Sequence, residues 1–378
     1  MNVRVAVLPG DGVGPEVTRE AVRVLGRVGA AHGHRFEFLE ELIGGAAIDA
    51  VGDPLPSQTQ ATVLSADAVL LGAVGGPRWS SPAASVRPEQ GLLRLRQLMG
   101  TFANVRPVAV HPALSNLSPI RPEILVNTDI LFIRELTGGL YFGEKTNERD
   151  EHGSWLRATD QCVYVADEVA RVVRMAGTFA RQRRSYVTSV DKANVLETSR
   201  LWRAVTTQIM RDEFPDVAVE HVLVDAFAMH LLRNPSRYDV VVTENLFGDI
   251  LTDEAAVLAG SIGVLPSASL GAADADGRRR GLYEPIHGSA PDIAGLGVAN
   301  PTGALLSAAM LLRYSLSLER AASDLEAAIS GTLCAGIRTA DCAVPGATPV
   351  STSAFADAVL ERLDSPQCGS TEASRAVS

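Results

Sequence analysis

Short apolar runs alternate with amphipathic helical patterns along the chain. Val3–Leu8 and Ala68–Leu71 are β-branched and aliphatic runs, short enough to be strands that are buried on both faces. Between them, Pro15–Val28 repeats apolar residues every three or four positions, which is the spacing of one helix face. We therefore expect a strand, a helix and a second strand in this order, as in a parallel sheet covered by helices.

The same alternation continues through the rest of the chain. It predicts further strands over Ile130–Arg134, Ser185–Ser189 and Asp239–Thr243, and helices over Glu168–Arg181, Ala193–Phe214, Ala304–Tyr314 and Ser317–Gly331. The predicted fold class is α/β with a largely parallel sheet. The sequence shows no internal repeat, and the small, polar tail 365–378 is expected to be disordered.

Composition and charge exclude several classes of function. The length of 378 residues is enough for about two domains. A net charge of −10 and an aromatic content of 5% argue against binding to nucleic acid, which needs basic and stacking surfaces. The densest apolar run, Ala304–Leu312, is about half as long as a membrane helix, and Pro9 breaks the N-terminal run too early for a signal peptide. With four cysteines and no CxxC pair, the chain is expected to be cytoplasmic and to bind no membrane.

A glycine-rich turn, GDGVGP (10–15), follows the first predicted strand and opens the first predicted helix. It differs from the dinucleotide fingerprint GxGxxG because Pro15 stands where the third glycine is needed. A tight strand-to-helix turn with proline at the helix start explains the pattern better. The sequence also contains neither a P-loop nor a GxSxG motif.

Three arginines, Arg96, Arg106 and Arg134, lie in apolar surroundings, where an unpaired charge would be costly. Each one alone could form a structural salt bridge. The planar guanidinium group also matches a carboxylate with two parallel hydrogen bonds. The three together favour a site for a di- or tricarboxylate.

Acidic residues could supply a metal site. Asp249 and Asp253 are four residues apart in a helical pattern and so share one face, while Asp225 closes an apolar run. Carboxylate oxygens suit Mg²⁺ or Mn²⁺, although such a pair is more often simply a solvated helix face. Lys192 and Tyr141 could act as a base and an acid; otherwise they are an exposed lysine and a packed aromatic residue.

Motifs of one enzyme family occur in order along nearly the whole chain. They include VAVLPGDGVGPEV (5–17), LLGAVGGPRW (70–79), FANVRP (102–107), RELTGGLYFGE (134–144), SVDKANVLE (189–197), FGDILTDEA (247–255) and YEPIHGSAPDIAG (283–295). In these motifs the chain resembles the β-decarboxylating dehydrogenases of the isopropylmalate and isocitrate type. The resemblance implies two α/β domains around a cleft rather than a classical Rossmann fold. Residues 1–102 and 260–378 would form the first domain, which bears the cofactor loop, and residues 103–259 the second, which bears the dimerisation, metal and substrate sites.

The resemblance also implies a role for each candidate residue. Tyr141 would be the catalytic acid and Lys192 the catalytic base. Metal binding would fall to Asp225, Asp249 and Asp253. Substrate binding would fall to Arg96, Arg106, Arg134 and Asp225, with Leu92, Leu93, Glu89 and Val195 around the substrate side chain. NAD binding would fall to Glu284, His287, Gly288, Ser289, Ala290, Pro291, Asp292, Ile293 and Asn300.

The implied reaction is the NAD-dependent oxidation and decarboxylation of a small 2-hydroxy dicarboxylate with Mg²⁺ or Mn²⁺. A homodimer would share its active sites, because Lys192 and Asp225 would act in the partner's site. Asp292 favours NAD over NADP, since a carboxylate repels a 2′-phosphate.

Leu92 and Leu93, just before Arg96, indicate an apolar, branched C3 substituent such as that of isopropylmalate, a leucine precursor. Arg94 is the residue that could instead favour an anionic group. The alternatives are a sister enzyme acting on isocitrate, homoisocitrate, tartrate or malate, a homologue of a specialised pathway, and a two-domain anion-binding protein without catalysis.

Overall fold

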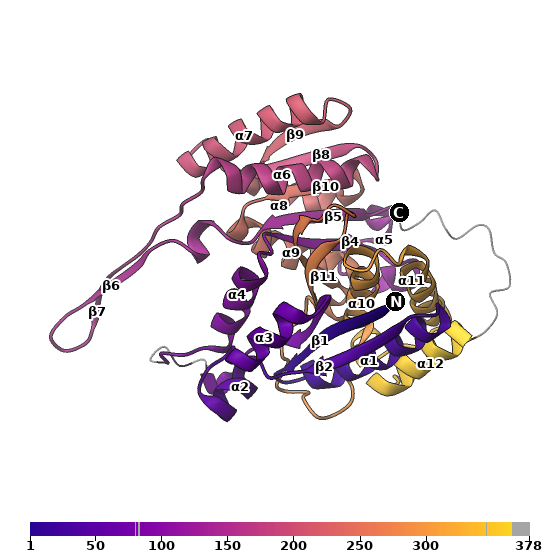
Figure 1. Cartoon of the computed structure of the whole chain (residues 1–378). Coiled ribbons are helices and arrows are strands. Elements are labelled where there is room, and N and C mark those ends of the chain that lie inside the picture. Colours follow the sequence, from indigo (N-terminus) through magenta and orange to yellow (C-terminus); the bar gives the residue numbers. More distant parts are fainter. Residues whose placement is uncertain (80, 82–83, 345, 365–378) are drawn as a thin grey trace. The chain divides into compact units, whose positions relative to one another are not determined.

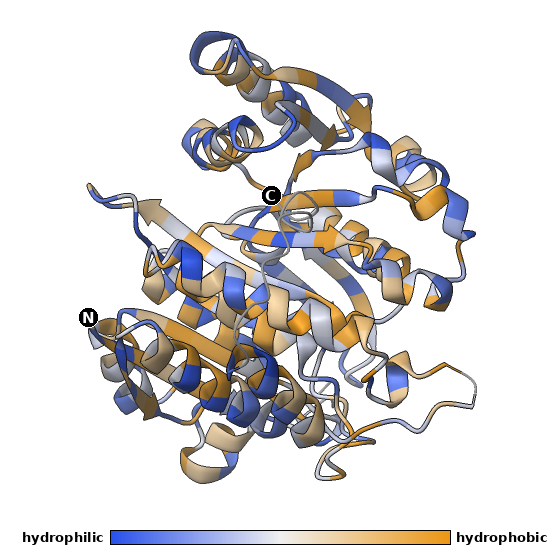
Figure 2. Cartoon of the chain, turned by 90° about the vertical axis from the view of Figure 1, so that its right-hand side faces the viewer, coloured by the Kyte–Doolittle hydropathy of each residue, from blue (hydrophilic) through white to orange (hydrophobic). Residues whose placement is uncertain are grey.

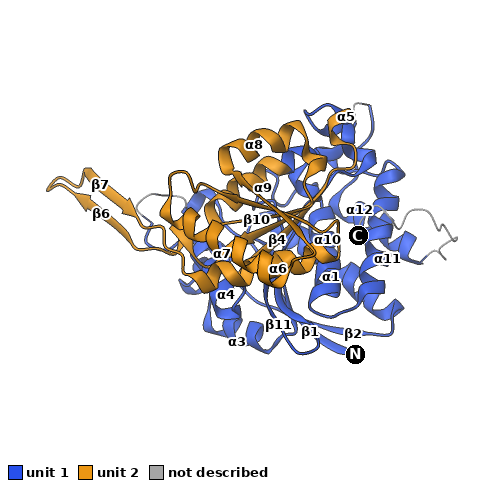
Figure 3. Ribbon diagram, turned by 90° about the horizontal axis from the view of Figure 1, so that it is seen from above, with its two compact units in different colours: residues 1–101, 109–122, 256–376 blue, residues 102–108, 123–255, 377–378 orange. Residues whose placement is uncertain are grey.

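The computed structural model describes residues 1–79, 81, 84–344 and 346–364, so the tail 365–378 lies outside the described residues. The chain divides into two compact units, shown in blue and orange in Figure 3. Unit 1 comprises Met1–Thr101, Ala109–Pro122 and the described part of Ala256–Ala376. Unit 2 comprises Phe102–Val108 and Glu123–Ala255.

The segment Ala109–Pro122 falls within the range that the resemblance implied for the second domain, yet it groups with unit 1. His111 Nε2 lies 2.9 Å from Ser330 Oγ, and Arg338 donates to the carbonyl oxygen of Ala113 at 2.7 Å. These hydrogen bonds attach the segment to late parts of the chain, which a division by sequence range does not reveal.

The strands of unit 1 lie in the order β2-β1-β3-β12-β11, and neighbours are parallel except for the antiparallel pair β11 and β12. Figure 1 labels its elements except β3 and β12. They are β1 (Asn2–Gly10), α1 (Gly14–Ala31), β2 (Arg35–Glu40), α2 (Gly44–Val51), α3 (Ser57–Ser65), β3 (Ala68–Ala73), α4 (Pro88–Met99), β11 (Pro266–Ala273), β12 (Arg279–Pro285), α10 (Thr302–Tyr314), α11 (Glu319–Cys334) and α12 (Thr352–Asp364).

The local predictions for unit 1 are confirmed. Val3–Leu8 and Ala68–Leu71 lie in β1 and β3, and Pro15–Val28 lies in α1 with a proline in its first turn. Hydrophobic and hydrophilic residues occur side by side along the helices in Figure 2, as expected for helices that cover a sheet.

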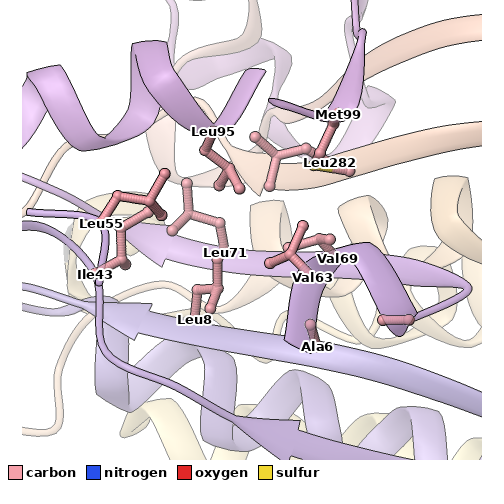
Figure 4. Packing of buried hydrophobic residues seen from close by; sticks show 11 residues of the cluster. Ala6, Leu8, Ile43, Leu55, Val63, Val69, Leu71, Leu95, Met99 and Leu282 are labelled. Carbon is pink, nitrogen blue, oxygen red and sulfur yellow. The ribbon is translucent and has the colours of Figure 1, made fainter. Parts of the chain in front are cut away.

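One hydrophobic cluster connects α4 to the strands of unit 1. In Figure 4, Leu95 of α4 points toward Leu71 of the sheet, and Met99 lies beside Leu282. The other buried members are Ala6, Ile43, Leu55, Val63, Ala66, Val69 and Leu282. This packing fixes which face of α4 is turned away from the core.

The strands of unit 2 lie in the order β4-β5-β10-β8-β9, and the pairs β5–β10, β10–β8 and β8–β9 are parallel. Its elements are β4 (Ala103–Ala109), α5 (Pro122–Leu125), β5 (Asp129–Glu135), β6 (Lys145–Arg149), β7 (Trp155–Asp160), α6 (Ala166–Arg181), β8 (Tyr186–Asp191), α7 (Glu197–Glu213), β9 (Ala218–Leu223), α8 (Val224–Arg233), β10 (Val240–Thr243) and α9 (Asn245–Ala259), with β4, α5 and α9 crossing the boundary by one to four residues. The hairpin β6–β7 is a separate antiparallel pair that is exposed along almost its whole length and extends from the rest of the unit (Figures 1 and 3).

The predicted start of one helix in unit 2 is wrong. The pattern placed a helix over Ala193–Phe214, but α7 begins at Glu197. The backbone N–H groups of Val195 and Leu196 both donate to the carbonyl oxygen of Lys192 at 3.0 Å. Lys192 therefore lies in a turn between β8 and α7. Within the described part of the chain, no helix has the length and apolar character needed to cross a membrane.

Candidate active site

Polar side chains of unit 2 gather where β5 and β10 end. Thr243, the last residue of β10, is the register partner of Arg134 in β5, and α9 begins two residues later. Within α9, Asn245, Asp249 and Asp253 follow one another at a spacing of four residues and so share one helix face. This face runs beside Arg134.

Arg134 is almost fully buried and is held by that face. Its Nε and Nη2 donate to Asn245 Oδ1 at 3.1 and 2.8 Å, and its Nη1 donates to Asp249 Oδ1. A Cβ atom at Gly248 would come within 2.5 Å of the Arg134 side chain, so glycine allows this close approach. Tyr141, in the 3₁₀ turn Gly139–Tyr141, donates its hydroxyl to Asp249 Oδ2 at 2.6 Å.

Arg106 in β4 joins the same cluster. Its Nε donates to Asn104 Oδ1 at 2.6 Å, and its Nη1 donates to Thr252 Oγ1 at 2.6 Å and to Asp253 Oδ1 at 3.4 Å. Its Nη2 lies 3.9 Å from Asp249 Oδ1. The structure thus brings Arg106, Arg134, Tyr141, Asp249 and Asp253 together.

The pKa values of the two carboxylates in this cluster are shifted in opposite directions. Burial opposes the ionisation of Asp249, but Arg134, Tyr141 and Arg106 together outweigh it and lower the pKa of Asp249. Burial raises the pKa of Asp253, and the neighbouring charge of Asp249 adds to the effect. Burial and the hydrogen bond to Asp249 raise the pKa of Tyr141 to about 12, so its hydroxyl keeps its proton at neutral pH.

The donor chemistry of Asp249 and Asp253 fits a hard divalent cation. Both offer carboxylate oxygens, and a nearby cation would relieve the repulsion that raises the pKa of Asp253. Over the residues that the structure describes, no three His, Cys, Asp or Glu side chains converge on one point. The pair on α9 could hold a metal ion only if further ligands came from elsewhere.

Lys192 and Asp225 form a separate pair in unit 2. Lys192 Nζ lies 2.7 Å from Asp225 Oδ1, and the hydrogen bond from Lys192 lowers the pKa of Asp225. Asp225 lies in the first turn of α8, directly after β9, and its side chain is 65% exposed. Val195, in the turn after Lys192, is 62% exposed. Asp225 is therefore exposed, and it completes no metal cluster with other described residues of its own chain.

In unit 1, Arg96 lies on α4 and pairs with the cofactor-loop candidate Glu284. Arg96 Nη2 donates to Glu284 Oε1 at 2.8 Å, and both side chains are about nine-tenths buried. Arg96 Nε is buried and has no hydrogen-bond partner among the described residues. An anion at Arg96 would satisfy this donor.

The other candidates on α4 have different surroundings. Leu92 packs in part against the hydrophobic cluster, whereas Leu93 is half-buried and Glu89 is exposed. Arg94, two positions from Arg96 and therefore on another side of the helix, donates to Asp53 Oδ1 at 2.6 Å. The helix face that carries Leu93 and Arg96 has no additional cation from Arg94.

Apart from Glu284, which lies in β12, the candidate NAD residues lie in a segment without regular structure between β12 and α10. Here Gly12 approaches the carbonyl oxygen of Ser289 so closely that a Cβ atom would lie 1.9 Å from it, and Val13 N–H donates to that oxygen at 2.8 Å. The glycine-rich turn therefore supports this loop, in agreement with its departure from a phosphate-binding fingerprint. Asp292 is exposed and Ile293 half-buried.

His287 and Asn300 show how the loop could accept a nucleotide. His287 Nδ1 lies 2.9 Å from the carbonyl oxygen of Gly288, which assigns the proton to Nδ1 and leaves Nε2 as an acceptor. Burial lowers the pKa of His287, and its Nε2 has no partner among the described residues. Asn300 is held by Asp341, to which its Nδ2 donates at 3.0 Å. A buried, unpaired acceptor suits an amino or hydroxyl group of a nucleotide.

Sequence reasoning missed the neutral residues that orient the charged ones. Asn245 holds Arg134, while Asn104 and Thr252 hold Arg106. The spacing contained a signal for two of them, since Asn245 precedes Asp249 by four residues on a helix and Asn104 precedes Arg106 by two on a strand. The pairing of Thr252 with Arg106 depends on tertiary contact alone.

Comparisons with known proteins point to one family. The model for the isocitrate/isopropylmalate dehydrogenase family matches residues 4–359. The chain is 57% identical, over 96% of its length and 100% of the relative, to the 3-isopropylmalate dehydrogenase of Anaeromyxobacter dehalogenans. It is 53% identical, over 97% and 100%, to that of Rhodopirellula baltica.

Two solved structures are similar to the chain as well. Isocitrate dehydrogenase from Methylococcus capsulatus superposes with a TM-score of 0.84 at 32% identity, covering 96% of this chain and 99% of that one. A β-decarboxylating dehydrogenase from Thermococcus kodakarensis superposes with a TM-score of 0.75 at 35% identity, covering 96% of both chains.

Proposed function

Since the chain belongs to the isocitrate/isopropylmalate dehydrogenase family, we propose that it oxidises and decarboxylates 3-isopropylmalate to 4-methyl-2-oxopentanoate and CO₂ in leucine biosynthesis. The relatives at 57% and 53% identity are named for this activity, and the match covers their whole length. The proposal for the substrate side chain rests on α4.

One observation carries the choice of substrate: the cation that could have recognised a third carboxylate is engaged elsewhere. Arg94 is bound to Asp53 on another side of α4, while Leu93 shares the face of Arg96. An unpaired carboxylate beside Leu93 would cost several kcal/mol. An isopropyl group there gains about 2 kcal/mol at about 25 cal/mol per Å². Isocitrate and homoisocitrate are therefore disfavoured.

The cluster in unit 2 suits acid catalysis and carboxylate binding. Tyr141 keeps its proton to a pKa of about 12 and can deliver it to C3 of the substrate after CO₂ is lost. Arg106 and Arg134 are oriented by Asn104 and Asn245, so each presents a fixed guanidinium plane to a carboxylate. Lys192 would remove the proton of the 2-hydroxyl group. These groups orient the bond that breaks.

We propose NAD as the oxidant and Mg²⁺ or Mn²⁺ as the metal. NAD would accept the hydride from C2, held by the loop from Glu284 to Asn300. The cation, held by Asp249, Asp253 and the partner's Asp225, would stabilise negative charge on the substrate oxygens. Asp292 is exposed and can accept hydrogen bonds from ribose hydroxyls, whereas it would repel a 2′-phosphate.

We further propose a homodimer with shared active sites. Lys192 and Asp225 form a pair in which only Asp225 is largely exposed, and Asp225 does not join the other two aspartates in its own chain. Apolar side chains are exposed nearby in sequence or on the neighbouring helices, namely Val195 (62%), Met229 of α8 (60%) and Ile250 of α9 (59%). A second copy of the chain would cover these residues and add the missing ligand and base.

The test is NADH formation, followed by absorbance, on a panel of diacids. We expect the kcat/KM for isopropylmalate to exceed that for malate by about 30-fold, the equivalent of about 2 kcal/mol, and isocitrate and tartrate to be poorer still. NAD should give a higher kcat/KM than NADP. A preference for isocitrate would contradict the apolar assignment of α4, and a preference for NADP would contradict the role of Asp292.

A further inference from the structure

We propose that Glu16 is a positioning residue for the dinucleotide: its carboxylate fixes the far end of the proposed NAD loop before the cofactor binds. The inference rests on the proposed role of that loop and deepens it. Glu16 lies in the first turn of α1, far in sequence from the loop, and directly follows the glycine-rich turn that did not fit a phosphate-binding motif.

Glu16 is a buried carboxylate that accepts hydrogen bonds from the backbone of the loop. Its side chain is buried, with 8% of the residue exposed. Its Oε1 accepts the backbone N–H of Gly295, and its Oε2 accepts the backbone N–H of Gly297 at 3.0 Å. One buried carboxylate thus satisfies two backbone donors that are two residues apart in the same loop.

The loop is held by hydrogen bonds rather than by regular structure, and the backbone N–H of Thr352 also donates to the carbonyl oxygen of Gly297 at 2.9 Å. It contains no helix or strand, and Gly295 and Gly297 both adopt positive φ angles, +80° and +66°. Leu296 between them is 65% exposed. Glu16 therefore adds two bonds to a charged acceptor, each stronger than a neutral hydrogen bond, at a point where two glycines allow the backbone many conformations.

The consequence for binding follows from preorganisation. Asp292 and Ile293 lie just ahead of the two fixed glycines, and they can meet the adenosine only if the loop backbone is in place. If the loop samples other conformations, the apparent affinity for the dinucleotide falls in proportion to the fraction of molecules in the binding-competent conformation. Loss of the two bonds should raise the Kd for NADH without changing the chemical step.

The experiment compares Glu16→Gln with a matched control, Glu20→Gln. Glutamine keeps the shape of Glu16, but its amide nitrogen must face one of the two backbone N–H donors. Glu20 lies on the same helix, is 2% exposed and pairs with Arg23 rather than with the loop. NADH affinity is measured by fluorescence titration without the diacid, and KM and kcat are measured with it.

We expect Glu16→Gln to raise the Kd for NADH and the KM for NAD about tenfold, which is equivalent to about 1.4 kcal/mol, with kcat and the KM for the diacid unchanged. Glu20→Gln should keep the wild-type Kd. Hydrogen exchange over residues 293–299 should accelerate in Glu16→Gln only. If Glu16 acted merely as a negative charge near the dinucleotide, the substitution would tighten NADH binding, and that result overturns the inference.

The wild-type protein gives a second, independent measurement in case Glu16→Gln does not fold. The amides of Gly295 and Gly297 should be protected from exchange before NADH is added; rapid exchange in the free protein would overturn the inference. Wild-type protein that binds no NADH would instead refute the proposed function. An unchanged Kd in folded Glu16→Gln, beside a wild type that binds NADH, would refute the role of Glu16 alone.

Discussion

Truncating Leu93 to alanine should selectively weaken the reaction with isopropylmalate. Leu93 is half-buried on α4 and is absent from the hydrophobic cluster that contains Leu95 and Met99. The substitution should therefore cost about 1 kcal/mol of stability or less. By contrast, Leu92 packs against that cluster, so its truncation would mix a folding defect with any effect on substrate.

The magnitude follows from the area that the leucine side chain can share with an isopropyl group. Removing three carbons from the side chain eliminates about 60 Å² of that contact. The loss is worth about 1.5 kcal/mol, or roughly tenfold in kcat/KM. Malate has no C3 substituent and serves as the internal control, because its kcat/KM should stay within about twofold of wild type. NADH absorbance with both diacids measures the ratio. Equal losses for the two substrates would refute the contact between Leu93 and the substituent.

Three further predictions concern the base, the assembly and stability. Lys192→Met should abolish hydride transfer while the Kd for NADH stays at its wild-type value; near-normal turnover would exclude Lys192 as the base. After subunit exchange, an equal mixture of inactive Lys192→Met and inactive Arg106→Ala should recover about a quarter of wild-type activity, because half of the dimers carry one intact shared site. No recovery despite exchange proven by mass spectrometry would count against shared sites. Burial, with help from the charge of Arg338, lowers the pKa of His111, and its Nδ1 accepts the backbone N–H of Ala113. The unfolded chain therefore binds a proton that the folded protein does not, and stability should fall as the pH drops below about 6.5. Thermal unfolding from pH 7.5 to 5 should show a smaller acid loss in His111→Gln than in wild type; identical losses would show that other groups cause it.

The sequence by itself determined the local elements and the identity of the chemistry. Runs such as Val3–Leu8 and Ala68–Leu71 became strands because burial on both faces demands unbroken apolar residues. The spacing of Asp249 and Asp253 placed both on one face of α9, as the helical repeat requires. The start of α7 was misplaced, because the turn at Lys192 depends on hydrogen bonds that periodicity does not encode.

Only the tertiary structure decided which charges meet. Arg134 and Asp249 are 115 residues apart, and Arg96 and Glu284 are 188 apart. A buried charge must find a partner, so the sequence could indicate that these arginines would be paired, but not with which group. The direction of Arg94 was equally open, until the position of Asp53 fixed it away from Arg96.

The support of the proposed NAD loop shows the same division. Glu16 reads as an ordinary acidic residue in the first turn of a helix, where the helix dipole alone would favour it. Its bond to Gly297 spans 281 residues and exists only because α1 and the loop pack together in unit 1. Local sequence determines the secondary structure in which a residue lies and the chemistry of its side chain. Folding determines which distant donors come within hydrogen-bonding distance of that side chain.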